Sequence, residues 1–225
     1  MFINFIKHVC IFFICIIFLL NKSYANNRNQ EFKSLYEISQ TYIKNSNWED
    51  AIKILLILKS KSHNSNEIKI ILTDLAYIYS NTGDIQLLEQ LVNKINILYP
   101  DTMNDYLLYL QGTTYLNKNK KNIFYKIRKK YDLENRKILF SYSKLNELII
   151  NYPESKYFSN AKKHLYYLDN ILAYRELNIA NFYYRKKEYL AAIKRSQDVI
   201  KNFSSSHYVN EAQLIINKVY IHNKL

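Results

Sequence analysis

The chain has 225 residues, of which 48% are hydrophobic, so it is long enough to bury one core of ordinary domain size. Only two glycines and two prolines are present, which leaves little material for the tight turns of hairpins and barrels and points to helices. The formal net charge of +13 comes from lysines scattered among polar residues, which is typical of solvated helix faces and argues against a nucleic-acid-binding stripe.

Residues 1–25 have the pattern of a signal peptide for export. A short basic start precedes twelve apolar residues (9–20), and Ala25 lies where a signal peptidase would cleave. Twelve residues are too few for a membrane span of roughly 20, although an uncleaved anchor stays an alternative. Both cysteines, Cys10 and Cys15, lie inside this segment, so the mature chain is expected to have no disulfide and no thiol chemistry. We therefore expect export to the periplasm of a Gram-negative-type cell.

Apolar residues recur at helical spacing through the rest of the chain. The first four stripes fall within residues 35–43, 51–58, 71–79 and 85–98. They come in pairs of about 34 residues, the period of tetratricopeptide repeats. We therefore predict an all-α fold, a tetratricopeptide-like solenoid of helical hairpins with about five repeats. It is expected to occupy residues 32–225, after a short linker at residues 26–31.

Small and aromatic residues occupy the fine positions of this repeat. They are Trp48 and Ala51 in the first pair, Gly83 in the second, where Leu88 replaces the alanine, and Tyr189 and Ala192 in a later pair. Gly83 is expected to end its helix in a left-handed conformation. The small residue lets two helices approach closely, so a bulky replacement of Ala192 is expected to overpack that seam.

Two similar stretches separate consecutive pairs, and they contain both prolines of the chain. They are "LYPDT" (residues 98–102) and "NYPES" (residues 151–155), while a third, "NFSSS" (residues 202–206), has serine in the place of proline. Proline cannot continue the outgoing helix, and the residue before it prefers an extended conformation. Ser155 or Thr102 is then expected to be the N-cap of the next helix. We interpret these stretches as the turns that end one helical hairpin and begin the next.

A basic insertion at about residues 117–132 interrupts the regular period between the two helices of the third pair. Insertions in repeat proteins map to loops on one face, often the binding face. The sequence leaves two interpretations open, a solvated basic loop and a contact with a partner. After the insertion, a long helical run is expected from Ser155 to about Arg185, and the last helix, Tyr208 to His222, is expected to be a terminal cap.

The chain has no recognisable catalytic constellation. Its five histidines are scattered without metal-ligand spacing, and it lacks a glycine-rich phosphate loop. We therefore predict that the protein is not an enzyme and uses neither a cofactor nor a metal. A stack of helical hairpins with many tyrosines instead suits the binding of extended peptides or protein ridges.

Five strings occur in order along the chain and carry a family resemblance. They are "NWEDAI", "LAYIYSNTGD", "DYLLYLQG", "FSYSKLNELIINYPESKY" and "ANFYYRKKEYLAAIKRS". Through them the chain resembles, from Tyr36 to Tyr220, the BamD family of periplasmic tetratricopeptide lipoproteins of the β-barrel assembly machinery.

The resemblance implies a non-catalytic scaffold that helps to assemble β-barrel proteins into the outer membrane. Its implied partners are the POTRA-bearing barrel protein BamA, other lipoproteins of the machinery and unfolded outer-membrane proteins, and not nucleic acid. An arginine of the fourth pair contributes to the POTRA contact in this family, and Arg195 occupies that place here. The N-terminal repeats are associated with the targeting strand of substrates. The weaker candidates for such a groove are Tyr36, Tyr42, Tyr77 and Tyr79.

The expected location is the periplasmic face of the outer membrane. Family members carry a lipid on a cysteine preceded by small residues, but Phe12, Phe13 and Ile14 precede Cys15 here, so lipidation of Cys15 is doubtful. The protein would then be held at the membrane through its partners. A soluble periplasmic adaptor of the cell-division coordinator type is the alternative function. A nucleic-acid-binding protein is a third hypothesis, and it rests only on charge.

Overall fold

The computed structural model describes residues 28–100, 104–119 and 131–222, and these residues form nine helices and no strand. The elements are the first helix (residues 28–44), α2 (Trp48–Lys61), α3 (Ser65–Thr82), α4 (Ile85–Leu98), α5 (Asn104–Asn119), α7 (Tyr131–Asn151), α8 (Phe158–Arg185), α9 (Tyr189–Asn202) and α10 (Val209–His222). The predicted all-α, tetratricopeptide-like fold is confirmed. The described helices make four consecutive pairs with α10 after them, where about five repeats were predicted.

Several predictions concern residues outside the described part of the chain. They are the signal peptide at residues 1–25, the Thr102 cap and most of the basic insertion at 117–132. Residue 28, inside the predicted linker at 26–31, is already helical. Among the helices of the described part, none is both long enough and apolar enough to cross a membrane.

The chain divides into two compact units between Ile78 and Tyr79, within α3. In the N-terminal unit, the first helix is tied to the end of α2 by an ion pair between Glu31 and Lys61, whose atoms are 2.6 Å apart. It is also tied to α3, because the Tyr36 hydroxyl donates a hydrogen bond to Asp74 at 2.9 Å. The core of this unit consists of apolar side chains with at most 2% exposure: Ala51, Leu55, Leu58, Ile71, Leu72, Leu75, Ala76 and Ile78.

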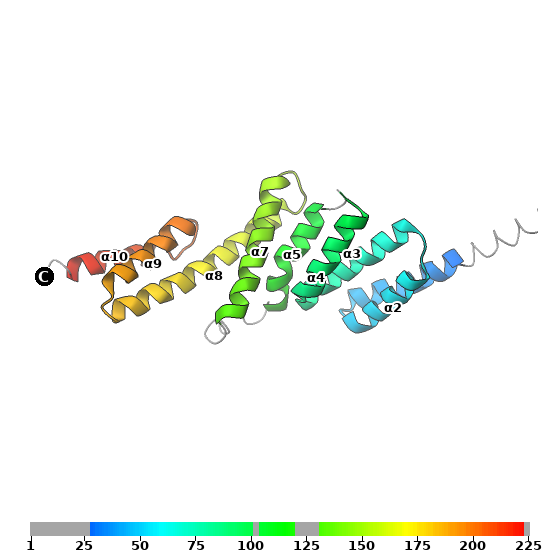
Figure 1. Ribbon diagram of the computed structural model, residues 1–225, viewed down its shortest axis with the longest axis horizontal. Helices are drawn as coiled ribbons and strands as arrows, with labels where there is room; N and C mark the ends of the chain where they lie inside the picture. The colour runs from blue at the N-terminus through cyan, green and yellow to red at the C-terminus, as the bar shows by residue number, and fades with distance from the viewer. Residues whose placement is uncertain (1–27, 101–103, 120–130, 223–225) are drawn as a thin grey trace, which may run out of the picture. The chain divides into compact units, whose positions relative to one another are not determined.

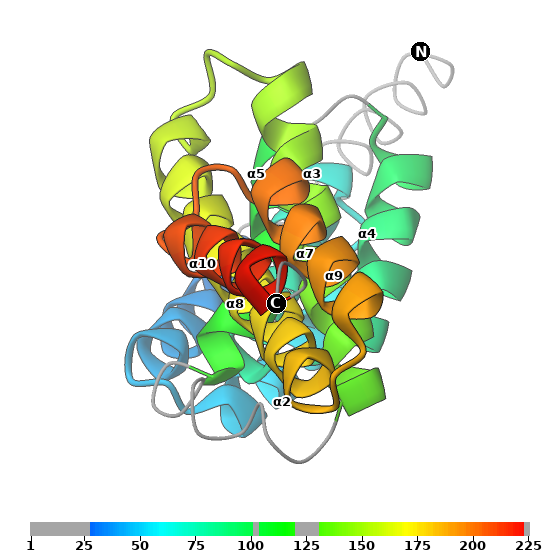
Figure 2. The same ribbon diagram turned by 90° about the vertical axis from the view of Figure 1, so that its left-hand side faces the viewer.

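In the C-terminal unit, each helix packs against its neighbours in the chain, as α4 on α5, α5 on α7, α7 on α8 and α8 on α9. Helix α8 has 28 residues and connects two cores, which confirms the long run predicted from the sequence. Figure 1 shows α9 folding back along the C-terminal half of α8. The last helix, α10, packs on both α8 and α9, as the end view in Figure 2 shows.

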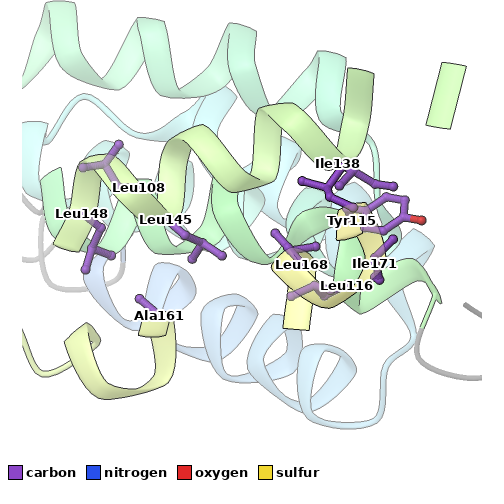
Figure 3. Close-up of a cluster of buried hydrophobic side chains, with 10 residues drawn as sticks. Leu108, Tyr115, Leu116, Ile138, Leu145, Leu148, Ala161, Leu168 and Ile171 are labelled. Carbon is purple, nitrogen blue, oxygen red and sulfur yellow. The ribbon is translucent and has the colours of Figure 1, made fainter. Parts of the chain in front are cut away.

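The first of these cores lies between α5, α7 and the N-terminal half of α8. Figure 3 shows its side chains meeting from the three helices, with Leu145 of α7 among them. Gly112 of α5 is buried directly against this leucine. The second core joins the rest of α8 to α9 and α10. Its buried members are Ala173, Leu177, Ala180, Ala192, Val199, Ala212 and Ile215.

Three of the helix pairs share one turn geometry. Each turn contains a residue with positive φ, namely Ser46 (57°), Gly83 (76°) and Lys187 (61°). In each, the next residue donates its backbone N–H to a carbonyl five residues earlier, as Asp84 does to Tyr79 at 3.1 Å. This pattern is that of a Schellman-type C-cap. The left-handed conformation predicted for Gly83 is confirmed.

The turn before α8 differs from the prediction in one respect. The N-cap of α8 is Tyr157, with no capping bond from its side chain, and Ser155 lies two residues earlier. The Ser155 hydroxyl instead accepts the Tyr157 backbone N–H at 3.1 Å, inside the turn. The predicted N-cap role of Ser155 is therefore wrong, because two further turn residues precede the first helical residue.

Candidate docking surfaces

Arg195 lies on α9, beside the stripe that packs this helix against α8. The stripe consists of Ala192, Ser196 and Val199, all completely buried. Ala192 is the small residue that the sequence predicted at a helix seam, and it belongs to the second core. Because Arg195 precedes Ser196 in the helix, its side chain leaves the seam at the edge of the α8–α9 contact.

The guanidinium of Arg195 is engaged within the chain. Its Nη1 donates a hydrogen bond to Oε2 of Glu176 on α8 at 2.9 Å. The side chains are 41% and 23% exposed, so solvent screens the pair, and its contribution to stability is about 0–1 kcal/mol. Arginine has five N–H donors in a planar fork, so a carboxylate could still bind the same guanidinium from outside.

Next to this ion pair, an open groove of about 590 Å³ lies between α7, α8 and α9. Glu176 contributes to its wall, together with Arg175 and Lys201, and Leu139 adds an exposed apolar surface. Two cationic side chains and one carboxylate give the groove a basic character that suits an acidic or amphipathic peptide surface.

Tyr142, in the same groove, lies close to Asp169 of α8. Burial raises the pKa of the Tyr142 hydroxyl, and the negative charge of Asp169 raises it further. Burial likewise raises the pKa of the Asp169 carboxyl, although hydrogen bonds from Ser205 and Tyr142 oppose this. The tyrosine therefore remains a neutral hydrogen-bond donor at the groove wall across the physiological pH range.

Among the four tyrosines predicted for an N-terminal groove, Tyr36 is hydrogen-bonded to another helix. Its hydroxyl and the Gln40 amide both donate to Oδ2 of Asp74, at 2.9 and 2.7 Å. Burial and then the charge of Asp74 raise the pKa of Tyr36 well above its ordinary value. Burial also raises the pKa of Asp74, and the two hydrogen bonds partly counter this. Tyr36 thus holds the first helix onto α3.

The other three tyrosines lie in different settings. Tyr77 is 37% exposed and meets the ring of Trp48 edge-on, with ring centroids 6.3 Å apart. Tyr42 is half-buried near the end of the first helix, where its carbonyl accepts the Asn47 backbone N–H. Tyr79 is half-buried on α3 and belongs to the C-terminal unit.

The described pocket of the N-terminal unit contains none of these tyrosines. It has a volume of about 330 Å³ and is lined by residues of the first helix, α2, the following turn and α3, including Phe32, Leu58 and Glu67. The structure therefore brings Trp48 and Tyr77 together, and none of the four predicted tyrosines lines this pocket.

Two side-chain partners of the candidate residues were not predicted from the sequence. Glu176 is the partner of Arg195, and Asp74 is the acceptor for Tyr36 and Gln40. The members of these pairs lie 19 to 38 residues apart, and no short-range spacing signals them. In the described part of the chain, no group of three or more His, Cys, Asp or Glu side chains is placed to hold a metal ion.

The chain is similar to known proteins along most of its length. The model of the YfiO family, described as outer membrane lipoprotein, matches residues 28–225. Similar relatives carry the name outer membrane protein assembly factor BamD. The relative from Buchnera aphidicola (subspecies Acyrthosiphon pisum) is 29% identical over 228 residues, covering 95% of this chain and 90% of the relative.

Two further relatives come from other bacteria. The protein of Vibrio cholerae is 28% identical over 190 residues, covering 83% of this chain and 78% of its own length. The protein of Neisseria meningitidis serogroup A is 26% identical over 190 residues, covering 84% and 71%. The matched residues include every helix described above, and this chain therefore belongs to the YfiO family of outer membrane lipoproteins.

Proposed function

We propose that this protein is a non-catalytic assembly factor for outer-membrane proteins, acting within the β-barrel assembly machinery at the periplasmic face of the outer membrane. The observation that carries this proposal is the family match over residues 28–225, together with relatives named as assembly factors that align over most of the chain. The helical pairs and their grooves suit protein docking. The relatives favour this function over that of a cell-division adaptor.

The partner that we propose for the C-terminal unit is a POTRA-bearing barrel protein. Arg195 would contact it through a carboxylate that binds the guanidinium next to Glu176, at the rim of the basic groove. A bidentate carboxylate contact depends on the fork of the guanidinium, which lysine does not reproduce. Glu176 would orient this fork before the partner arrives.

The test is the affinity of the full chain for the purified POTRA domains of that barrel protein. Arg195→Glu is expected to weaken binding by about 2–5 kcal/mol if the new pair is buried. Lys194→Glu, at an exposed position one residue away on α9, makes the same change of charge and is the matched control. Equal dissociation constants for the two variants would contradict a specific role of Arg195.

A charge swap separates docking from local stability. In Arg195→Glu/Glu176→Arg, the ion pair between α8 and α9 can form again with reversed polarity. If Arg195 acts only by holding α9 on α8, the double variant should recover the affinity. If it binds the partner carboxylate, as proposed, the double variant should stay impaired while its thermal stability returns to that of the parent chain.

For substrates, we propose that unfolded outer-membrane proteins contact the N-terminal tyrosines, with Tyr77 and Trp48 as the most accessible pair. Tyr77→Ala is expected to weaken the binding of a peptide with the C-terminal strand of a β-barrel protein. Tyr36→Phe is the comparison, because its hydroxyl is bonded to Asp74 within the chain. A larger loss of peptide binding in Tyr36→Phe than in Tyr77→Ala would contradict this assignment.

A further inference from the structure

Two turns between consecutive hairpins have the same hydrogen bonds, although only one contains proline. They are residues 152–158, before α8, and residues 203–209, before α10. The serine N–H donates three residues back in both, from Ser155 to Tyr152 at 3.1 Å and from Ser206 to Phe203 at 2.9 Å. The serine hydroxyl then accepts the N–H two residues on, at 3.1 and 3.2 Å. Proline is therefore not what sets this geometry.

The same serine hydroxyls bind back to the first helix of the hairpin that has just ended. The Ser155 hydroxyl donates to Oδ2 of Asp105 on α5 at 2.6 Å. The Ser206 hydroxyl donates to Oδ1 of Asn170 on α8 at 2.8 Å, and both of these residues are 5% exposed. The orientation of the Asn170 amide is fixed by its other bonds, since its Nδ2 donates to the Tyr166 carbonyl at 2.8 Å.

An aromatic contact accompanies each serine bond. The tyrosine two residues after the serine packs on the tyrosine four residues after the Asp or Asn. Tyr157 stacks on Tyr109, with ring centroids 4.8 Å apart, and Tyr208 meets Tyr174 at 5.2 Å. Ring pairs at such separations stabilise a contact beyond the area that they bury. Each turn thus has a serine hydrogen bond and a ring pair to the earlier helix, and in the second turn the His207 backbone N–H also donates to Oδ1 of Asn170, at 3.1 Å.

The turn before α3 shows what happens without this arrangement. Ser62 also accepts the backbone N–H two residues on, from Asn64 at 3.3 Å. However, its hydroxyl donates forward to Glu67 of α3, and Asn64 stands where the other turns have tyrosine. The Ser62 backbone N–H also donates four residues back, to Leu58 at 2.9 Å, and not three. The bond that the serine hydroxyl accepts from the N–H two residues on therefore occurs without the backward contact, which is made at Ser155 and Ser206.

We propose that two sequence elements together form a clamp that fixes the start of the next hairpin. One is an Asp or Asn followed four residues later by Tyr on the first helix of a hairpin, and the other is Ser-x-Tyr in the turn that follows the hairpin. The first clamp joins α5 to the start of α8, and the second joins α8 to the start of α10. The second lies on α8 just before Glu176, the partner of Arg195. It therefore restrains α10 from the same stretch of α8 that holds Arg195.

Amide hydrogen exchange of the full chain tests whether the clamps act locally. Loss of one buried hydrogen bond changes a local opening equilibrium by roughly three- to tenfold. Ser206→Ala is expected to speed exchange in Val209–His222 by about this factor and to leave the start of α8 unchanged. Ser155→Ala is expected to do the reverse. Ser205→Ala removes a neighbouring exposed hydroxyl, which donates to Asp169 at 3.2 Å, and should change α10 less than twofold.

A second pair of variants tests the aromatic half of the second clamp. Tyr208→Leu should speed exchange in α10, whereas Tyr208→Phe keeps the ring and should not. The proposal is overturned if Ser206→Ala affects both turns equally, if Ser205→Ala matches it, or if Tyr208→Leu and Tyr208→Phe behave alike. Faster exchange confined to α10 in Ser206→Ala and Tyr208→Leu supports it.

Discussion

One methyl group added at Gly112 on α5 should lower the stability of the folded chain. A Cβ built there would lie 2.5 Å from both Cγ and Cδ2 of Leu145 and 3.2 Å from its backbone N. Real carbon atoms do not approach this closely, and Leu145 is completely buried in the core of α5, α7 and α8. Overpacking of this kind costs about 1–3 kcal/mol, here near the upper value because two atoms clash.

The helix propensity of alanine offsets part of this cost. Replacing glycine by alanine inside a helix gains about 1 kcal/mol, so Gly112→Ala should lower the free energy of unfolding by about 2 kcal/mol. Urea denaturation followed by circular dichroism measures this difference. A neutral or stabilising effect would refute the close approach of α5 and α7 at this point.

A double-mutant cycle adds a sharper test. Leu145→Ala alone should cost about 2–5 kcal/mol, because it leaves a cavity in the core. In the presence of Leu145→Ala, the added methyl of Gly112→Ala no longer meets the two clashing atoms. The double variant should therefore be at least about 1 kcal/mol more stable than expected from adding the effects of the two single changes. Additive effects would show that the two side chains do not meet.

Three other changes have outcomes that follow from the structure. Gly83→Ala should destabilise the chain by about 1 kcal/mol, and Lys187→Gly should stabilise it by about 0.5–1 kcal/mol, because a left-handed conformation is costly for any residue with a Cβ. Ala192→Leu should cost about 1–3 kcal/mol, since this residue is completely buried between helices. The parent chain should lose stability as the pH rises and Asp74 gives up its proton, and Asp74→Asn should not show this loss. Burial raises the pKa of this carboxyl above 3.8, so the folded chain holds its proton more tightly than the unfolded chain does.

Each of these changes has a control or a contradicting result. Lys186→Gly, next to Lys187 but with φ of −80°, should not stabilise the chain, and equal gains at both positions would contradict the turn geometry. A silent Ala192→Leu would show that the seam between the helices is loose. For Asp74→Asn, the thermal stability of the variant relative to the parent should rise from about pH 4 upwards, and parallel pH curves for variant and parent would be inconsistent with a raised pKa of the half-buried carboxyl.

The helices and their pairing could be predicted from the sequence because apolar periodicity is a local signal. The left-handed turn was predicted at Gly83, where glycine marks it, but not at Ser46 or Lys187, which adopt the same conformation. At those two positions the Schellman-type hydrogen bonds offset the cost of positive φ, and neither serine nor lysine predicts a left-handed conformation. Proline was similarly a useful marker of the end of α4 and of the turn before α8, although the turn before α10 forms without it.

Long-range side-chain pairs were beyond prediction. The sequence identified Arg195 but not Glu176, which lies on another helix, and it identified Tyr36 without the half-buried Asp74 that binds it. Ser155 was predicted as an N-cap because serine before a helix usually has this role. Its actual bond to Asp105 spans 50 residues and depends on how α5, α7 and α8 pack. Such contacts are set by tertiary packing and leave no spacing pattern to read.

Depletion of this chain from cells tests most directly whether docking by its paired helices serves the assembly of outer-membrane β-barrel proteins. Folded β-barrel proteins can be counted by their changed gel mobility without heating. On depletion, folded forms should fall and unfolded forms should accumulate in the periplasm, and the parent chain and Lys194→Glu should restore assembly better than Arg195→Glu. Unchanged levels of folded β-barrel proteins after complete depletion would contradict the proposed function.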